Sequence, residues 1–366
     1  MKAKRVLASV ISGLLIILMI VSLFPLTYVF RLQDHNNRII SGFYGEKENS
    51  LDMVYIGGSA CFVYWEPLRA WNTYGFTSYN YAHDTITPQA VKYDMIEIAK
   101  TQSPKLWVID LRPFQYGEEK IPEVDENIPV MECEVPLRNI SDHMQYSQNR
   151  IDLINAHPVK WKDKIYYYWD FLKYRENWWQ IAEEGIESIK TGDFSSFGSY
   201  KSTNTYKGFH FIPSTEEVHF VDYSNITEEK KLPESVDKLF LDTIKFCKDN
   251  NYNVLFVVHS YIQKESDKKE YNYMKRIIEK NGYGFLNAND YYKEVGLDYS
   301  FDMYNDNHVN IFGAEKYTDF LSKYIMEHYM LQDKRNDLEY AEWNTLYTEF
   351  SKKVDSTKKQ VRALKE

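Results

Sequence analysis

Short, almost wholly apolar segments alternate along this chain with segments of helical periodicity, and this alternation limits the possible folds more than any other feature. The apolar segments are residues 51–56, 76–81, 106–110, 254–258 and 284–286. The helical segments are residues 62–74, 87–101, 233–250 and 268–281, and a last one that begins after Asn310. Strands that are apolar on both sides are typical of parallel sheets covered by helices. The sequence therefore predicts an α/β fold with a parallel sheet.

Between residues 115 and 228 the alternation breaks down. This stretch is rich in aromatic residues, among them Tyr166, Tyr167, Tyr168, Trp169, Trp178 and Trp179. We interpret it as an insertion over the carboxyl edge of the sheet, where sites form in such folds. Its aromatic side chains either form the core of the insertion or stack on sugar rings. The domain is predicted to span residues 51–330, and a charged helical tail follows at 331–366, with Leu338, Trp343 and Leu346 able to dock.

The N-terminal segment predicts where the protein resides. Lys2, Lys4 and Arg5 precede residues 6–30, a run without charge that can cross ~30 Å of hydrocarbon as a helix. The positive flank should stay in the cytoplasm, so the rest of the chain, beginning with a polar spacer at 32–50, should be extracellular. A cleaved signal peptide is the alternative, but the run is long and no small-x-small cleavage site follows it. We therefore expect a single-pass anchor in the cell membrane.

Composition excludes several classes of function. The formal net charge is −9, and no basic stripe is present, which argues against nucleic acid as a partner. The three cysteines (Cys61, Cys133 and Cys247) are too few and too scattered for a disulfide framework or a zinc site. Neither a metal nor another cofactor is predicted. Cys61 either packs beneath a turn or supplies a catalytic thiol.

The first predicted strand stops abruptly at Gly57-Gly58-Ser59. Two glycines let the backbone turn sharply, so that the Ser59 hydroxyl and its own N–H can face a substrate. A tight strand-to-helix turn with a capping serine is the alternative. The downstream sequence decides between them, because it supplies the partners that a nucleophilic serine needs.

Acyl transfer through serine needs a base, an acid that orients the base, and N–H donors for the oxyanion. His308 is the predicted base, because it lies in a loop between an acidic run and a turn, at Asn310 and Gly313, that leads into the last helix. Three other histidines compete for the role; they are His83, His210 and His259. Of these, His259 directly follows the fourth strand and is expected to contact substrate.

Four blocks of sequence resemble the SGNH/GDSL hydrolase superfamily over most of residues 51–330. They are Gly57-Gly58-Ser59, Thr77-Ser78-Tyr79-Asn80, Val108-Ile109-Asp110-Leu111-Arg112 and Asp306-Asn307-His308-Val309-Asn310-Ile311-Phe312-Gly313-Ala314. The resemblance is strongest to the membrane-anchored branch of Gram-positive bacteria, which is similar to the lipoteichoic-acid D-alanyl transfer protein. It implies a flavodoxin-like three-layer α/β/α sandwich and serine acyl-ester chemistry.

One departure from the family pattern concerns the catalytic acid. The family commonly has it three residues before the histidine, where this chain has Asn305. Asp306 lies two residues before His308, a spacing seen in related alginate-type acetyltransferases, and Asp302 lies six before it. Asp306 is the predicted acid, with Asp302 and Asn305 as the alternatives.

The oxyanion hole is the second departure. Ala82 stands where the family usually has a glycine, and its N–H is predicted to join that of Ser59 as an oxyanion donor. Asn80 either shapes this hole or serves as a turn residue. Arg112 and Asp110 form a structural ion pair, or Arg112 meets a phosphate or carboxylate of the substrate.

The sequence thus predicts an extracellular, membrane-anchored O-acyltransferase or esterase that acts on a cell-envelope polysaccharide or teichoic-acid-like polymer. The resemblance implies a further partner, a multipass membrane O-acyltransferase that delivers acyl groups across the lipid bilayer. The alternative is a catalytically degenerate protein of the same fold that serves as a binding or accessory protein for a membrane O-acyltransferase.

Overall fold

The computed structural model of the chain describes residues 2–23, 30–115 and 135–365. Its centre is a five-stranded parallel sheet in the order β2-β1-β3-β4-β5. The strands are β1 Met53–Gly57, β2 Ser78–Ala82, β3 Leu106–Asp110, β4 Val254–Val258 and β5 Gly284–Asn287. They confirm the predicted strands to within two residues. The strand order reverses between β1 and β3, and such a switch point is where α/β folds place their sites.

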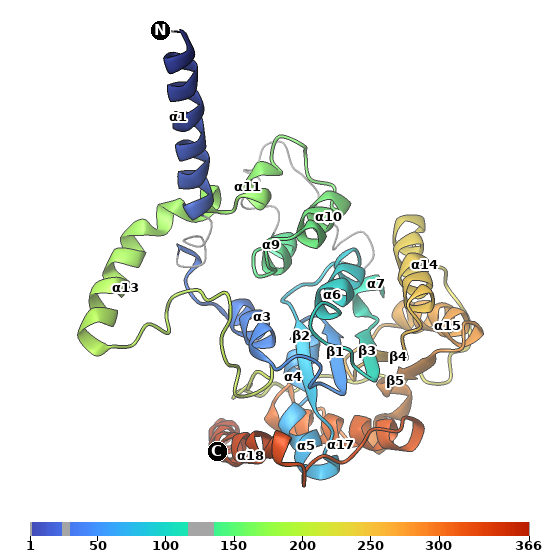
Figure 1. Cartoon of the computed structure of the whole chain (residues 1–366). Helices are drawn as coiled ribbons and strands as arrows, with labels where there is room; N and C mark the ends of the chain where they lie inside the picture. Colours follow the sequence, from blue (N-terminus) through green and yellow to red (C-terminus); the bar gives the residue numbers. More distant parts are fainter. Residues whose placement is uncertain (1, 24–29, 116–134, 366) are drawn as a thin grey trace.

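Helices cover both faces of the sheet (Figure 1). On one side lie α5 Pro67–Tyr74, α17 Ile311–His328 and α18 Ala341–Ala363, and on the other α6 Ala90–Ile98, α7 Arg112–Gln115, α14 Glu234–Asp249 and α15 Glu265–Lys280. The single helix expected at 62–74 is two, because α4 Ser59–Tyr64 ends before Pro67 begins α5. Proline fits the first turn of a helix but not its interior. Short elements η3 Ala288–Tyr291 and α16 Tyr292–Val295 follow β5.

The predicted spacer at 32–50 is wrong, because most of it folds into the buried helix α3 His35–Gly45. Asp34 caps the helix by accepting a hydrogen bond from the Asn37 N–H at 2.7 Å. Ile39 and Phe43 are fully or almost fully buried, and the Ile39 carbonyl accepts a bond from the Tyr79 hydroxyl of β2. Polar neighbours conceal this apolar stripe in the sequence.

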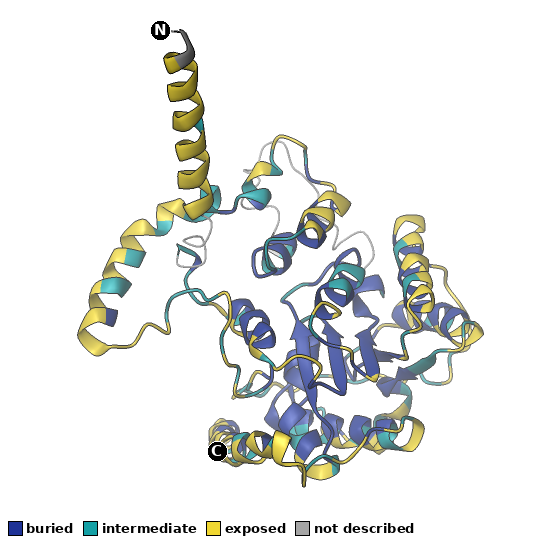
Figure 2. Cartoon of the chain, in the orientation of Figure 1, coloured by how far each residue is buried: buried dark blue, intermediate teal, exposed yellow. Residues whose placement is uncertain are grey.

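Nearly all the described residues of the N-terminal apolar helix α1 Lys2–Leu23 are exposed, and the helix is long enough to cross a membrane. Figure 2 shows it exposed along its length. The expected end of the span at residue 30 is wrong, since Phe30 and Arg31 belong to the folded domain. The Phe30 ring lies 5.4 Å from that of Phe171, and the buried Arg31 guanidinium pairs with the Asp170 carboxylate.

The described part of the insertion is helical. It consists of α9 Val135–Ser141, α10 Gln148–Ala156, α11 Ile165–Tyr168, α12 Phe171–Tyr174, η2 Arg175–Asn177 and α13 Trp178–Thr191. Only some of the aromatic side chains form the core: Tyr167 is fully buried, whereas Trp178 and Trp179 are 49% and 66% exposed. Charged side chains also form part of the core, because Asp170 accepts hydrogen bonds from Arg31, Arg150 and Tyr146.

The C-terminal tail docks as a helix, as predicted for Trp343. This side chain is buried, and its ring lies 5.4 Å from that of Trp71 on α5. Phe350 and Val361 extend the same buried face of α18. Leu338 does not dock, since it lies in the short η4 Leu338–Tyr340 that precedes α18 and is 91% exposed.

Candidate active site

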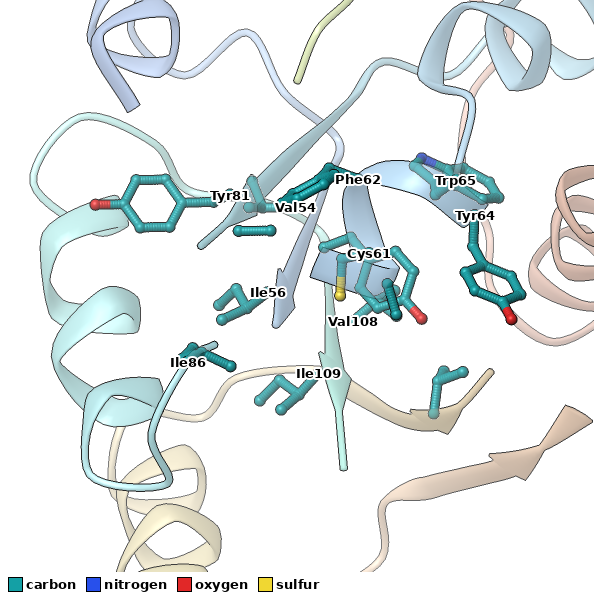
Figure 3. Close-up of a cluster of buried hydrophobic side chains, with 14 of the residues drawn as sticks. Val54, Ile56, Cys61, Phe62, Tyr64, Trp65, Tyr81, Ile86, Val108 and Ile109 are labelled. Atoms are coloured by element: carbon teal, nitrogen blue, oxygen red, sulfur yellow. The ribbon is translucent and has the colours of Figure 1, made fainter. Parts of the chain in front are cut away.

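The turn after β1 places Ser59 at the start of α4. A side chain at Gly57 would put its β-carbon 2.3 Å from the Cys61 sulfur and 2.6 Å from the Asp110 β-carbon, so only glycine fits there. Figure 3 shows Cys61 among the apolar side chains beneath this turn. Burial raises the pKa of the Cys61 thiol well above its ordinary value. Cys61 is thus a packing residue, as is the buried Cys247, while Cys133 lies outside the described residues.

A small hairpin presents His308 to this turn. It pairs β6 Met303–Asn305 with β7 His308–Val309 in antiparallel fashion, and Asn310 then caps α17. A β-carbon at Gly313 would lie 2.6 Å from the Asp302 carbonyl oxygen, which explains why a glycine follows the cap. Ser59 Oγ lies 2.7 Å from His308 Nε2, so the predicted proximity of these two side chains is confirmed.

Asn305, not Asp306, is the hydrogen-bond partner of the other ring nitrogen. His308 Nδ1 lies 3.0 Å from Asn305 Oδ1, which also accepts the Asn307 N–H at 2.9 Å. The backbone donor identifies this amide atom as oxygen, so Nδ1 carries the proton and Nε2 is free to accept one from Ser59.

The prediction for Asp306 is corrected by the register of the hairpin. Asn305 stands opposite His308 in the β6–β7 pair, whereas Asp306 lies in the turn, where its carbonyl accepts the Ile262 N–H at 2.8 Å. Asp302 is buried and holds the Lys316 ammonium at 2.6 Å, which makes it a structural residue.

The environment of His308 keeps its ring neutral. Burial, together with the nearby His259 and Arg112, lowers the pKa of His308 to about 4. The imidazole is therefore unprotonated at neutral pH, which is the form that a general base requires.

We expect the rate at which Ser59 reacts with a fluorophosphonate probe to fall on acidification with a midpoint near pH 4, because protonated His308 cannot act as base. Asn305→Asp would place a carboxylate beside Nδ1 and should raise this midpoint by about one to three pH units. The measurement is the labelling rate between pH 3 and 8. Asp306→Asn is the matched control and should shift the midpoint far less; a larger shift there than in Asn305→Asp would contradict the assignment.

Arg112 forms part of the wall beside His308. Its Nη2 donates to Asn307 Oδ1 at 2.8 Å, its Nη1 lies 3.2 Å from His259 Nε2, and its guanidinium stacks 4.2 Å above the Tyr261 ring. The predicted Asp110–Arg112 ion pair takes another form, because Asp110 accepts the backbone N–H of Arg112 at 3.1 Å. These bonds connect Arg112 through Asn307 to Asn305, the partner of the His308 ring.

His259, which was expected to contact substrate, is not among the residues that line the cavity. It is fully buried, with Nδ1 3.5 Å from Asp110 Oδ1, and burial lowers its pKa. His83 is also buried, and it is bound to Asp94 and to the Asn139 carbonyl. His210 packs against Phe62 and His35 instead.

The backbone of β2 does not direct the N–H of Ala82 or of Asn80 toward Ser59. The His83 N–H bonds the Gly57 carbonyl, whereas the Asn80 N–H bonds Lys207 on the outer edge. Because backbone groups alternate along a strand, the Ala82 N–H also points to that outer edge, away from Ser59. The Asn80 side chain donates to the Trp65 carbonyl at 2.9 Å and so holds the end of α4.

Thr85, in the loop that follows β2, lines the same cavity as Ser59. Its φ of 55° is unusual for a β-branched residue. Strained backbone of this kind is concentrated at functional sites. No sequence pattern identifies Thr85 as a cavity residue, because its position depends on the conformation of the loop that follows β2.

These residues enclose a cavity of about 170 Å³. Its lining consists of Gly58, Ser59, Ala60, Thr85, Ile86, Asp110, Arg112, Pro113, Asn307 and His308. Within the described residues, no cluster of three or more histidine, cysteine or acidic side chains is arranged to hold a metal ion.

Comparison of the chain with protein-family models, with curated proteins and with solved structures gives no match. The fold itself defines the class: this is an α/β protein with a five-stranded parallel sheet flanked by helices and preceded by one apolar helix.

Proposed function

We propose that the protein is a serine acyl-ester enzyme of the SGNH type, an O-acyltransferase or esterase that acts on a cell-envelope glycopolymer. The observation that carries the proposal is the pair formed by Ser59 Oγ and His308 Nε2 at 2.7 Å, with the other ring nitrogen held by Asn305. A strand-turn-helix serine at the switch point of a parallel sheet supports it.

Catalysis would proceed in two half-reactions. Ser59 Oγ attacks the acyl carbonyl of the donor ester while its proton moves to His308 Nε2. The backbone N–H of Ser59 faces the oxyanion. Collapse of the tetrahedral intermediate breaks the bond to the donor alcohol, which takes the proton from Nε2. An acceptor hydroxyl, or water, then attacks the acyl-Ser59 ester, loses its proton to His308 and releases the serine.

Asn305 makes this a dyad with an oriented base. Its oxygen fixes the productive tautomer of His308, but it adds no negative charge to stabilise the imidazolium that forms during attack. Arg112 lies close enough to lower the pKa of His308 further. The expected consequence is a slower reaction than that of a triad with a carboxylate.

The same observation favours a second candidate function, a non-catalytic binding or accessory protein. An amide oxygen, that of Asn305, in place of the carboxylate that a triad would have is the arrangement expected at His308 Nδ1 after catalytic activity has been lost. Covalent labelling of Ser59 by a fluorophosphonate distinguishes the two, since only an activated serine reacts.

We place the enzyme on the outer face of the cell membrane, anchored by α1, where a multipass O-acyltransferase could supply acyl groups. Lys2, Lys4 and Arg5 precede the apolar run and should remain in the cytoplasm.

A protease added to intact protoplasts should therefore digest the domain, as followed by immunoblotting with an antibody to the C-terminal tail. A cytoplasmic protein is the control and should stay intact. Full protection of the domain until the cells are lysed would reverse the proposed orientation.

A further inference from the structure

A second and larger cavity, of about 670 Å³, opens between α3, α18 and the segment 195–213. Arg38 and Lys353 contribute two cationic groups to its lining, and none of the residues that line it is acidic. The other lining side chains include hydroxyl and amide groups and the aromatic rings of Tyr206 and Phe211. In a chain with a net charge of −9, a groove lined by two cations and by no acidic residue favours a negatively charged ligand.

The elements that line this groove contact elements that line the catalytic cavity. Phe62 lies on α4 with Ser59, its carbonyl accepts the His210 N–H at 2.7 Å, and its ring lies 4.3 Å from that of His35. His35 and His210 both line the groove. A second connection runs through Asp84, whose N–H donates to Asn36 of α3 at 2.9 Å and which precedes Thr85 of the catalytic cavity.

The polar groups of the groove suit a ligand that is both charged and rich in hydroxyl groups. Burial lowers the pKa of His35 to about 3 and also lowers that of His210, so both rings are neutral and can accept as well as donate hydrogen bonds. His35 Nε2 is buried without a hydrogen-bond partner in the described part of the chain. The faces of Tyr206 and Phe211 offer apolar surface to a sugar ring.

We propose that this groove binds an anionic, polyhydroxylated chain, made of sugar or polyol units that carry phosphate or carboxylate groups. Arg38 and Lys353 neutralise the anionic groups, while the neutral histidines and the hydroxyl and amide side chains bind the hydroxyl groups. That the bound chain is the acceptor of the acyl group on Ser59 rests on the proposed function; binding itself does not.

The test measures binding to the full chain in detergent micelles, with Ser59→Ala to exclude turnover. Fluorescent oligogalacturonate serves as the carboxylate probe, a glycerol-phosphate oligomer as the phosphate probe, and maltohexaose as the neutral comparison. We expect at least one anionic probe to bind more tightly than maltohexaose and to weaken as salt is added. The double variant Arg38→Ala, Lys353→Ala should raise its Kd about tenfold or more, because hydrogen bonds to charged groups are lost.

Two further variants complete the test. Arg38→Lys with Lys353→Arg keeps both charges and should bind almost as tightly as the parent. Lys245→Ala with Lys323→Ala removes two exposed charges elsewhere and should leave the Kd unchanged. The proposal would be overturned if the Arg38→Ala, Lys353→Ala variant bound the anionic probe as tightly as the parent does. It would also be overturned if maltohexaose bound the parent as tightly as the anionic probes do. Fluorophosphonate labelling of the chain with Ser59 intact separates enzyme activity from binding by the groove. A failure to label Ser59 would refute the enzyme activity and leave the binding proposal unaffected.

Discussion

Replacing His308 by alanine should slow fluorophosphonate labelling of Ser59 by about 10²–10⁴-fold, the range that general-base catalysis contributes. The reason is that Ser59 Oγ has His308 Nε2 as its proton acceptor at 2.7 Å. Ser59→Ala should abolish labelling altogether. The measurement is the rate of incorporation of the probe, with the labelled residue identified by mass spectrometry of the digested protein.

The matched control for this experiment is His328→Ala. His328 is exposed near the end of α17, where its ring bonds the Tyr324 carbonyl, and its loss should leave the labelling rate unchanged. Melting temperatures establish that each variant is folded. If the unaltered protein is not labelled, or if Ser59→Ala is labelled as fast, the enzyme proposal is wrong and an accessory role is favoured.

Replacing Asp170 by alanine should destabilise the domain by about 3–5 kcal/mol, the usual loss when one partner of a buried ion pair is removed. Asp170 is fully buried and accepts hydrogen bonds from Arg31, Arg150 and Tyr146. Its loss would leave two buried guanidinium groups without this carboxylate. Thermal unfolding of the full chain in detergent, followed by near-ultraviolet circular dichroism, measures the effect.

Glu339→Ala provides the comparison. Glu339 pairs with Lys47 on the surface, where both side chains are at least half exposed, and such pairs contribute little because water screens them. We expect its melting temperature to stay close to that of the parent. A melting temperature for Asp170→Ala as high as that for Glu339→Ala would mean that the buried cluster adds nothing to stability.

The sheet could be predicted because its strands are buried on both faces, which leaves a continuous apolar run such as Leu106–Asp110 in the sequence. Helix ends were harder. Residues 62–74 read as one helix, although Pro67 divides them, and α3 was missed because polar residues separate its buried Ile39 and Phe43. Tertiary packing decides where these helices begin and end, and local composition reveals little of that packing.

The Ser59–His308 pair could be predicted because Ser59 follows two glycines at the end of a strand, and His308 lies between an acidic run and the turn into the last helix. The contacts that the surrounding residues make could not. Whether Asn305 or Asp306 meets the ring depends on the register of a hairpin with very short strands, and the position of Arg112 depends on contacts with Asn307 and His259 that are far apart in sequence. Such choices follow from tertiary structure, which a single sequence does not display.

The contacts of Phe30 and Arg31 limit how far the domain can stand from the bilayer. Leu23 ends α1, and Phe30 is already held by Phe171 and by Asn177, whose side chain donates to the Phe30 carbonyl at 2.8 Å. Seven residue steps cover at most about 25 Å. With α1 in the membrane, this short connection would keep the domain close to the bilayer surface, so that it diffuses only in the plane of the membrane. Under the proposed function, polymer chains would have to approach the membrane surface to be modified, and those anchored in the same bilayer would stay within reach.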